Sequence, residues 1–186
     1  MRSVPGAGPM RYEIELVKGW SDWVAAASIV RDNLAEAGIA VSVKALDYDD
    51  WVDALALGRF SLGLWFGDRG PTPYQFYRGQ MDPLLVRPIG TKTDANFHRF
   101  GSAEAGSLLR RFETTSDVAE LTEIAHGLEK VYVDETPSMP LFASPLWGVV
   151  DTTRFTGFPS RFNPYGAAAP LAPPDSLLVL VQVTPR

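Results

Sequence analysis

The chain has 186 residues and a net charge of −5; 46% of its residues are hydrophobic and 21% are charged. This length and composition are typical of a globular protein with a buried core, which excludes a wholly disordered chain. The absence of cysteine excludes disulfide bonds, thiolate metal ligands and a thiol nucleophile, and 17 Lys and Arg residues without a basic run disfavour nucleic-acid binding.

Alternating strand and helix patterns begin at Arg11. Apolar residues at every second position predict one strand over residues 12–17 and another over 39–43. Between them, Ser21 or Asp22 is expected to cap a helix of about 16 residues with Trp23, Ala27, Val30 and Leu34 on its apolar face. Gly38 stands where glycine commonly ends a helix. Because a helix separates the two strands, they are expected to be parallel.

A second helix and a third strand extend this pattern. Residues 49–57 are expected to form a helix that ends at Gly58, and the apolar residues 60–66 are expected to form a strand. The order strand, helix, strand, helix, strand within about 55 residues predicts an open α/β sheet, mostly parallel and flanked by helices.

The rest of the chain is less regular. Residues 67–92 contain four prolines and four glycines and are expected to form a long loop, with a short helix opened by Thr72 and Pro73. Helices over 102–112 and 117–134 are expected to pack as a hairpin, because their connection is short. Strands are expected over 140–143 and 146–150, and the apolar run 177–183 is predicted to be a strand as well.

The sequence shows no membrane or export signal. No segment has the roughly 18–20 consecutive apolar residues of a membrane-spanning helix. Residues 1–10 are rich in glycine and proline and lack the apolar stretch of a signal peptide, so they are expected to be a flexible lead-in.

Common catalytic and metal-binding patterns are missing from the sequence. His98 and His126 have no second ligand at metal-binding spacing, so no metal or other cofactor is expected. His126 lies off the apolar stripe of its predicted helix, which predicts an exposed side chain. Asp49 and Asp50 are explained by a helix N-terminus, where negative charge is favourable. The sequence therefore favours a binding function over bond chemistry.

The segment after the third predicted strand carries the candidate binding residues. Ligands bind open α/β sheets in the crevice beyond the carboxyl ends of the strands, where Trp65 and Asp68 are expected. Alternation from Phe60 to Phe66 predicts that Trp65 faces away from the bulkier apolar row. An indole can stack on a sugar ring or pack on a peptide side chain. A carboxylate can accept hydrogen bonds from hydroxyl groups or pair with an ammonium.

A structural role stays open for each candidate. Trp65 can be a core residue, and Asp68 can bond to the backbone of its own turn or pair with Arg69. Tyr74 and Tyr77, on the short helix after this segment, can contact a ligand or anchor the loop.

Several short motifs follow one another from about residue 11 to the end of the chain. They occupy residues 12–17, 34–43, 58–68 with Pro73, 96–105, 135–141 and 155–158. Their order and spacing resemble family 5 extracellular solute-binding proteins, the oligopeptide and dipeptide receptors of ABC importers. Residues 70–74 and 163–165 resemble the branch that includes oligosaccharide binders. The resemblance implies a periplasmic-binding-protein-like lobe with a helix hairpin and a C-terminal crossing segment.

The resemblance also implies a place in a larger protein. It implies that residues 11–175 are a C-terminal lobe and that residues 176–186 are a strand that pairs with a missing first lobe. It implies an extracytoplasmic location, periplasmic or lipid-anchored at the cell surface, and an ABC permease as partner. Without that lobe, the apolar strand would be unpaired, and strand exchange in a homodimer would cover its exposed edge.

Individual residues can be matched to this family. Trp65 and Asp68 match its pocket tryptophan and the carboxylate that holds the ligand's amino terminus, and Asn96 matches the segment that leads into the helix hairpin. The implied function is capture of an oligosaccharide or oligopeptide by closure of two lobes. The expected ligand-binding residues are Trp65, Asp68, Tyr74, Tyr77 and Asn96.

Two other functions stay open. A secreted glycan-acting hydrolase would use Asp68 and a second carboxylate as acid and base, but the sequence places no second carboxylate beside it. A dimerising structural domain without a ligand would account for the apolar run 177–183.

Overall fold

The computed structural model describes residues 2–6, 8–70, 72–143, 148–167, 169 and 175–186. The chain divides into two compact units, residues 1–139 and 140–186, which are described separately. This division differs from the expected limits of a lobe at 11–175 and a crossing segment at 176–186, which remain a prediction. No helix in the described part of the chain has the length and apolarity needed to cross a membrane.

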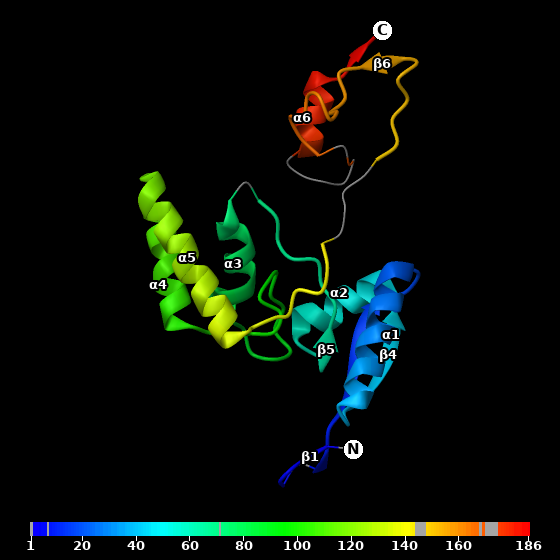
Figure 1. Ribbon diagram of the computed structural model, residues 1–186, viewed down its shortest axis with the longest axis vertical. Coiled ribbons are helices and arrows are strands. Elements are labelled where there is room, and N and C mark those ends of the chain that lie inside the picture. Colours follow the sequence, from blue (N-terminus) through cyan, green and yellow to red (C-terminus); the bar gives the residue numbers. More distant parts are fainter. Residues whose placement is uncertain (1, 7, 71, 144–147, 168, 170–174) are drawn as a thin grey trace. The chain divides into compact units, whose positions relative to one another are not determined.

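The first unit opens with a small hairpin and continues with alternating strands and helices (Figure 1). The elements are β1 (Ser3–Val4), β2 (Gly8–Pro9), β3 (Arg11–Val17), α1 (Ser21–Glu36), β4 (Ala40–Leu46), α2 (Tyr48–Leu57) and β5 (Leu62–Gly63). They are followed by α3 (Pro73–Met81), the 3-10 helix η1 (Pro83–Leu85), α4 (Ala103–Thr114) and α5 (Val118–Glu135). The hairpin of β1 and β2 lies in the expected lead-in, so this segment has a structure that the sequence did not predict.

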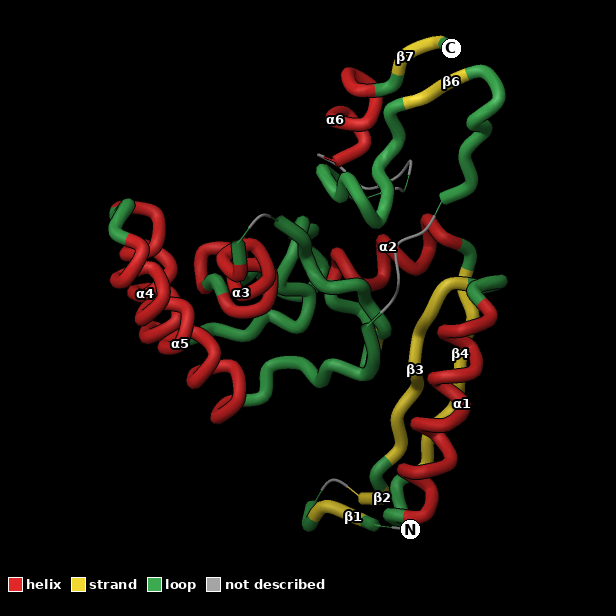
Figure 2. The backbone as a smooth tube through the Cα atoms, turned by 45° about the horizontal axis from the view of Figure 1, so that its top comes forward, coloured by secondary structure: helices red, strands yellow, loops and turns green. Residues whose placement is uncertain are grey.

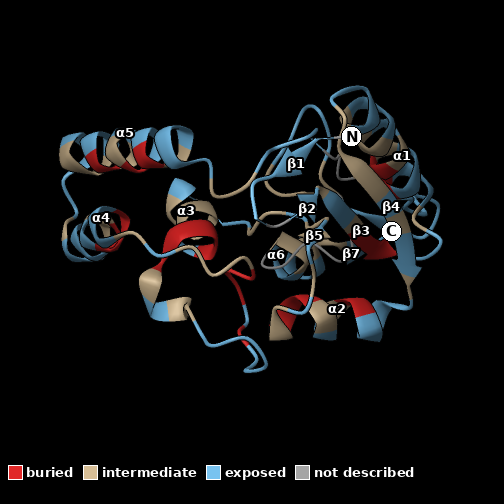
Figure 3. Ribbon diagram, turned by 90° about the horizontal axis from the view of Figure 1, so that it is seen from below, coloured by how far each residue is buried: buried red, intermediate tan, exposed pale blue. Residues whose placement is uncertain are grey.

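The predicted parallel sheet is confirmed. Its strand order is β4-β3-β5, and β3 runs parallel to both neighbours, with Ile14 opposite Val43 and Leu62. Figure 2 shows β3 and β4 side by side, and Figure 3 shows α1 and α2 on opposite faces of the sheet. Strand β5 is shorter than the expected 60–66. At its start, the Ser61 hydroxyl bonds to both the amide and the carbonyl of Glu13 in place of a backbone ladder bond.

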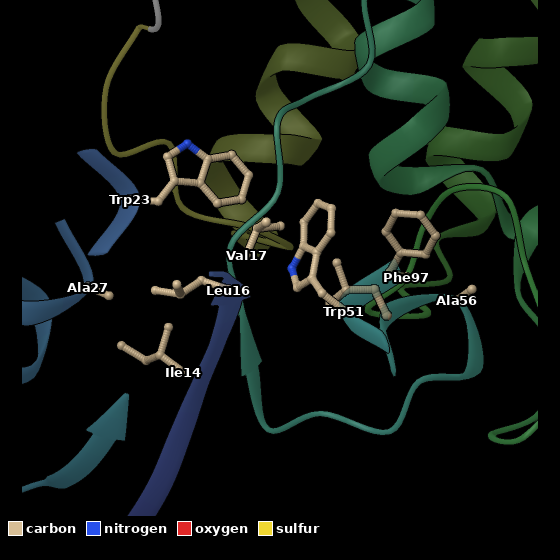
Figure 4. Packing of buried hydrophobic residues seen from close by; sticks show 9 residues of the cluster. Ile14, Leu16, Val17, Trp23, Ala27, Trp51, Ala56 and Phe97 are labelled. Carbon is tan, nitrogen blue, oxygen red and sulfur yellow. The ribbon is translucent and has the colours of Figure 1, made fainter. Parts of the chain in front are cut away.

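One hydrophobic core lies around this sheet. Ile14 and Leu16 project from β3 toward Ala27 of α1 (Figure 4). Leu16, Ala27 and Trp51 have no exposed surface. On the predicted inner face of α1, Trp23 and Ala27 are buried, and Val30 and Leu34 are partly buried. Its predicted cap is wrong, because the N-cap residue is Trp20 and no side chain caps the helix.

A second core lies between α3 and the predicted helix hairpin, which is confirmed. Its buried side chains are Met81, Ala105, Leu109, Ile124, Leu128 and Val131. Ser102 and Asp117 cap α4 and α5 by accepting hydrogen bonds from backbone amides. His126 is exposed, as predicted. The short helix expected after Thr72 is confirmed as α3, which has nine residues.

Gly58 ends α2 in the left-handed conformation, with φ of 69°. A Cβ at this position would overlap the guanidinium of Arg99, which donates a hydrogen bond to the Ala56 carbonyl at 2.9 Å. We therefore expect Gly58→Ala to lower the free energy of unfolding by about 1–2 kcal/mol or more. Urea denaturation measures this loss. Gly101→Ala is the matched control, because its nearest neighbour would be 4.0 Å away; an equal loss in both variants contradicts the prediction.

The second unit contains β6 (Phe155–Thr156), α6 (Asp175–Gln182) and β7 (Thr184–Pro185), with β6 and β7 antiparallel. The predicted strand over 177–183 is wrong, because most of this run lies in helix α6. Its side chains do not alternate, and a short uniformly apolar run fits either a buried strand or a helix. The expected homodimer depended on this strand, so the structure gives no support for it.

Two further predicted strands fall in this unit. Residues 140–143 and 148–150 have no regular secondary structure, so the strand expected at 140–143 is wrong. Residues 146 and 147, at the start of the other expected strand, lie outside the described residues.

Candidate functional site

Aromatic side chains gather at the carboxyl ends of the parallel strands. Trp20 follows the end of β3, Tyr48 follows the end of β4, and Trp65 and Phe66 follow β5. Their rings form one continuous set of contacts with rings from α1, α2 and the loop before α4. We call this set the aromatic cluster: Trp20, Trp23, Tyr48, Trp51, Trp65, Phe66 and Phe97. Ligands of open α/β sheets bind at this edge.

Trp65 lies within the aromatic cluster and is half-buried. Its ring stacks on Trp51 at 5.0 Å and on Phe66 at 4.3 Å, and meets Phe97 edge-on at 4.6 Å between ring centroids. The prediction that it faces away from the apolar residues is wrong. Because β5 ends at Gly63, strand alternation no longer fixes the direction of Trp65. The ring thus packs on the core and stays partly exposed.

Asp68 is half-buried against helix α3. Its Oδ2 occupies the space that a Cβ of Gly79 would need, so this glycine makes room for the carboxylate. Burial raises the pKa of Asp68, and the positive charge of Arg78 partly offsets this. Among the described residues, none is hydrogen-bonded to this carboxylate, and Arg69 does not pair with it. An acidic group that is partly desolvated in this way is common at binding sites.

Tyr74 and Tyr77 face the helix hairpin. The ring of Tyr74 stacks on Phe112 at 5.4 Å, and its hydroxyl donates a hydrogen bond to Glu113. Burial, and then this hydrogen bond, raise the pKa of Tyr74 to about 12. Tyr77 lies 6.0 Å from Tyr132 between ring centroids, and burial raises its pKa too. These contacts fit the anchoring role that the sequence left open, because they hold α3 on α4 and α5.

Asn96 is buried, with 1% of its surface exposed. Its Nδ2 donates to the carbonyls of Asp82 at 3.0 Å and Phe100 at 2.8 Å, and its Oδ1 accepts from the Phe100 amide at 2.9 Å. Both amide hydrogens are therefore used within the protein. The expected ligand contact is corrected to a structural role, in which Asn96 fixes the loop that joins α3 to α4.

His98 has a structural environment as well. Its Nε2 donates to the Gln80 carbonyl at 2.8 Å, and burial lowers its pKa. No group of three or more His, Asp or Glu side chains in the described ranges could hold a metal ion.

No protein-family model matches the chain, and no curated protein matches its sequence. A solved structure matches it throughout. This is the mannohexaose-bound periplasmic oligopeptide-binding protein of an ABC transporter from Thermotoga maritima, with a TM-score of 0.83 and 24% identity, over 100% of this chain and 35% of that one. The chain has a periplasmic binding-protein fold. It spans about a third of that neighbour's length.

Other proteins share this binding-protein fold over part of the chain. Helicobacter pylori DppA, in complex with the peptide STSA, has a TM-score of 0.60 and 18% identity over 69% of this chain and 24% of its own. Campylobacter jejuni NikZ, in complex with Ni(L-His), has a TM-score of 0.61 and 13% identity over 71% and 26%. The predicted fold class, a parallel sheet flanked by helices in a periplasmic-binding-protein-like arrangement, is confirmed.

Three aromatic residues at the carboxyl ends of the parallel strands were not among the binding residues predicted from the sequence. Trp20, Tyr48 and Phe66 each come within three residues of the end of a parallel strand. That position is a usable signal, because the carboxyl ends of parallel strands meet at one edge. The binding residues predicted from strand position come only from the segment after the third strand.

Proposed function

We propose that this chain is a substrate-binding lobe of an ABC-type importer, which captures an oligosaccharide or an oligopeptide and performs no bond chemistry. The observation that carries the proposal is the half-exposed Trp65 and the partly desolvated Asp68 beyond the carboxyl end of β5. Capture would use the indole as a stacking surface and the carboxylate as a hydrogen-bond acceptor. Closure against a second lobe would hide these contacts from water.

The structural neighbours support this proposal through what their names state. They are periplasmic proteins of ABC transporters, bound in one case to mannohexaose and in another to a peptide. An extracytoplasmic location, a permease partner and a preceding lobe are part of the same proposal for this chain.

The hydrolase alternative gains no support. A glycosidase needs two carboxyl groups within about 10 Å of each other across the scissile bond. The sequence places no second carboxylate beside Asp68, and the structural neighbours are binding proteins.

We expect Trp65→Ala and Asp68→Asn each to weaken ligand binding about tenfold or more, because each removes one of the two proposed contacts. The 186-residue chain is titrated with mannohexaose and, separately, with the peptide STSA, and binding is followed by two-dimensional NMR. This method detects the affinities expected of one lobe, with dissociation constants in the millimolar range, about −4 kcal/mol.

Asp68→Asn also separates function from stability. Because burial raises the pKa of Asp68, the folded chain holds this proton more tightly, and stability falls as pH rises from about 4 through the raised pKa. Asp68→Asn is expected to remove that decline.

Asp134→Asn, at an exposed position of α5, is the control for the binding experiment and should leave binding unchanged. Parent-like binding by both site variants, or no binding of either ligand by the parent, would overturn the proposal.

A further inference from the structure

We infer that Trp20, Tyr48 and Phe66 form a second subsite beside Trp65, which binds successive rings of a neutral oligosaccharide. We call these three residues the aromatic shelf. The inference rests on the proposed function and specifies its ligand class. It concerns residues outside the site that the sequence predicted.

The aromatic shelf is a continuous surface. The Trp20 ring lies 6.3 Å from Tyr48 and 6.4 Å from Phe66 between centroids, so Trp20 joins the other two. Phe66 in turn stacks on Trp65 at 4.3 Å. The shelf therefore continues the aromatic surface from Trp65 along the ends of β5, β3 and β4. Successive sugar rings of an oligosaccharide would need such a surface.

Two of these rings, Tyr48 and Phe66, are exposed, and Trp20 is partly buried against the core. Tyr48 is 50% exposed and Phe66 is 39% exposed, whereas Trp51 beneath them has no exposed surface. The core thus gains little from the outer faces of the shelf. An exposed group of aromatic side chains at the ligand-binding edge indicates a binding surface.

The charges around the shelf disfavour an anionic ligand. Within two residues of Trp20 and Tyr48, the charged side chains are Lys18, Asp22, Asp47, Asp49 and Asp50. Lys18 pairs with Asp47 at 3.3 Å, which leaves three acidic groups in excess. An acidic sugar or a peptide carboxyl terminus would be repelled here, while carboxylates can accept hydrogen bonds from sugar hydroxyls.

Aromatic faces suit sugar rings better than an extended peptide. A pyranose ring has a face of C–H groups that packs on an aromatic ring and a rim of hydroxyls that bond at the sides. An extended peptide takes much of its affinity from backbone hydrogen bonds along a strand edge. The faces of Trp20, Tyr48 and Phe66 supply no such backbone partners.

The test compares long and short neutral sugars on the 186-residue chain. Tyr48→Ala/Phe66→Ala and, separately, Trp20→Ala are titrated with mannohexaose, mannobiose, an acidic oligogalacturonate and the peptide STSA, and binding is followed by NMR. We expect both variants to bind mannohexaose about tenfold more weakly. Trp20→Ala should leave the weaker binding of mannobiose at Trp65 and Asp68 unchanged, because the Trp20 ring contacts Phe66 and Tyr48. Tyr12→Ala is the matched control, because Tyr12 is 37% exposed at the opposite end of β3.

Each outcome has a defined meaning. Parent-like mannohexaose binding by the shelf variants overturns the second subsite, and the proposed function stands if Trp65→Ala and Asp68→Asn still lose binding. Tighter binding of the peptide or the acidic sugar than of mannohexaose overturns the ligand class. Failure of the parent to bind any of the four probes overturns the proposed function and the inference together.

Discussion

Trp51→Ala is expected to lower the free energy of unfolding by about 3–5 kcal/mol, because it removes a fully buried indole. The ring stacks on Trp65 at 5.0 Å and lies 5.7 Å from Trp23 and 5.6 Å from Tyr48 between centroids. It is thus the support on which the outer rings rest. Loss of this support should also weaken ligand binding, although Trp51 itself is not exposed.

Trp51→Phe separates the ring from its N–H group. The Trp51 Nε1 is buried and has no hydrogen-bond acceptor among the residues that the structure describes. An unpaired buried donor costs about 1–3 kcal/mol, so its removal offsets part of the lost packing. We therefore expect Trp51→Phe to cost clearly less than Trp51→Ala.

Urea denaturation followed by circular dichroism measures both changes. Ile29→Ala is the control, and a change within about 0.5 kcal/mol is expected because Ile29 is 62% exposed on α1. Equal losses for Trp51→Phe and Trp51→Ala would show that the indole N–H has no cost in the folded chain.

The α/β part of the fold could be predicted because its elements carry strong periodic patterns and clear helix ends. Strands β3 and β4 alternate, α1 and α2 have apolar faces, and Gly38 and Gly58 take the positive φ expected after a helix. Ser102 and Asp117 likewise start the hairpin helices where their side chains cap them. These signals are local, so the sequence alone was sufficient.

The predictions failed where the structure depends on distant contacts. The run Leu177–Val183 has no period that separates strand from helix, and residues 140–143 resemble a strand only by composition. The direction of Trp65 depends on the end of β5 at Gly63 and on ring contacts with Trp51 and Phe97, which come from other parts of the chain. Tyr74 became an anchor through Phe112 and Glu113, nearly forty residues later in the chain.

The location of the candidate site could be predicted from the sequence, but not all of its residues. The rule that ligands bind at the carboxyl ends of parallel strands led to Trp65 and Asp68. The same rule, applied to all three strands, would have added Trp20 and Tyr48. Asn96 was predicted as a ligand contact because the sequence shows its amide but not the backbone carbonyls to which that amide is bonded.

Asn96→Asp is expected to lower the free energy of unfolding by about 3–5 kcal/mol at neutral pH, the cost of an uncompensated buried charge. Asn96 donates to the carbonyls of Asp82 and Phe100, and an aspartate would turn a carboxylate oxygen toward those same oxygens. The asparagine also tolerates its φ of 49°, which few other side chains do. The loop between α3 and α4 should loosen first.

The loss should depend on pH with a definite sign. Burial beside carbonyl oxygens raises the pKa of the introduced aspartate in the folded state, so the folded chain binds the proton more tightly. The variant should therefore lose stability as pH rises from about 4, the ordinary aspartate value, and regain part of it below that pH, where a protonated carboxyl can donate one hydrogen bond. Asn33→Asp, exposed in the last turn of α1, is the control and should cost no more than about 1 kcal/mol, the effect of a negative charge at a helix C-terminus. Urea denaturation at pH 4 and pH 7 measures both variants, and a pH-independent loss at Asn96 would mean that the side chain acts through its shape and not through its hydrogen bonds.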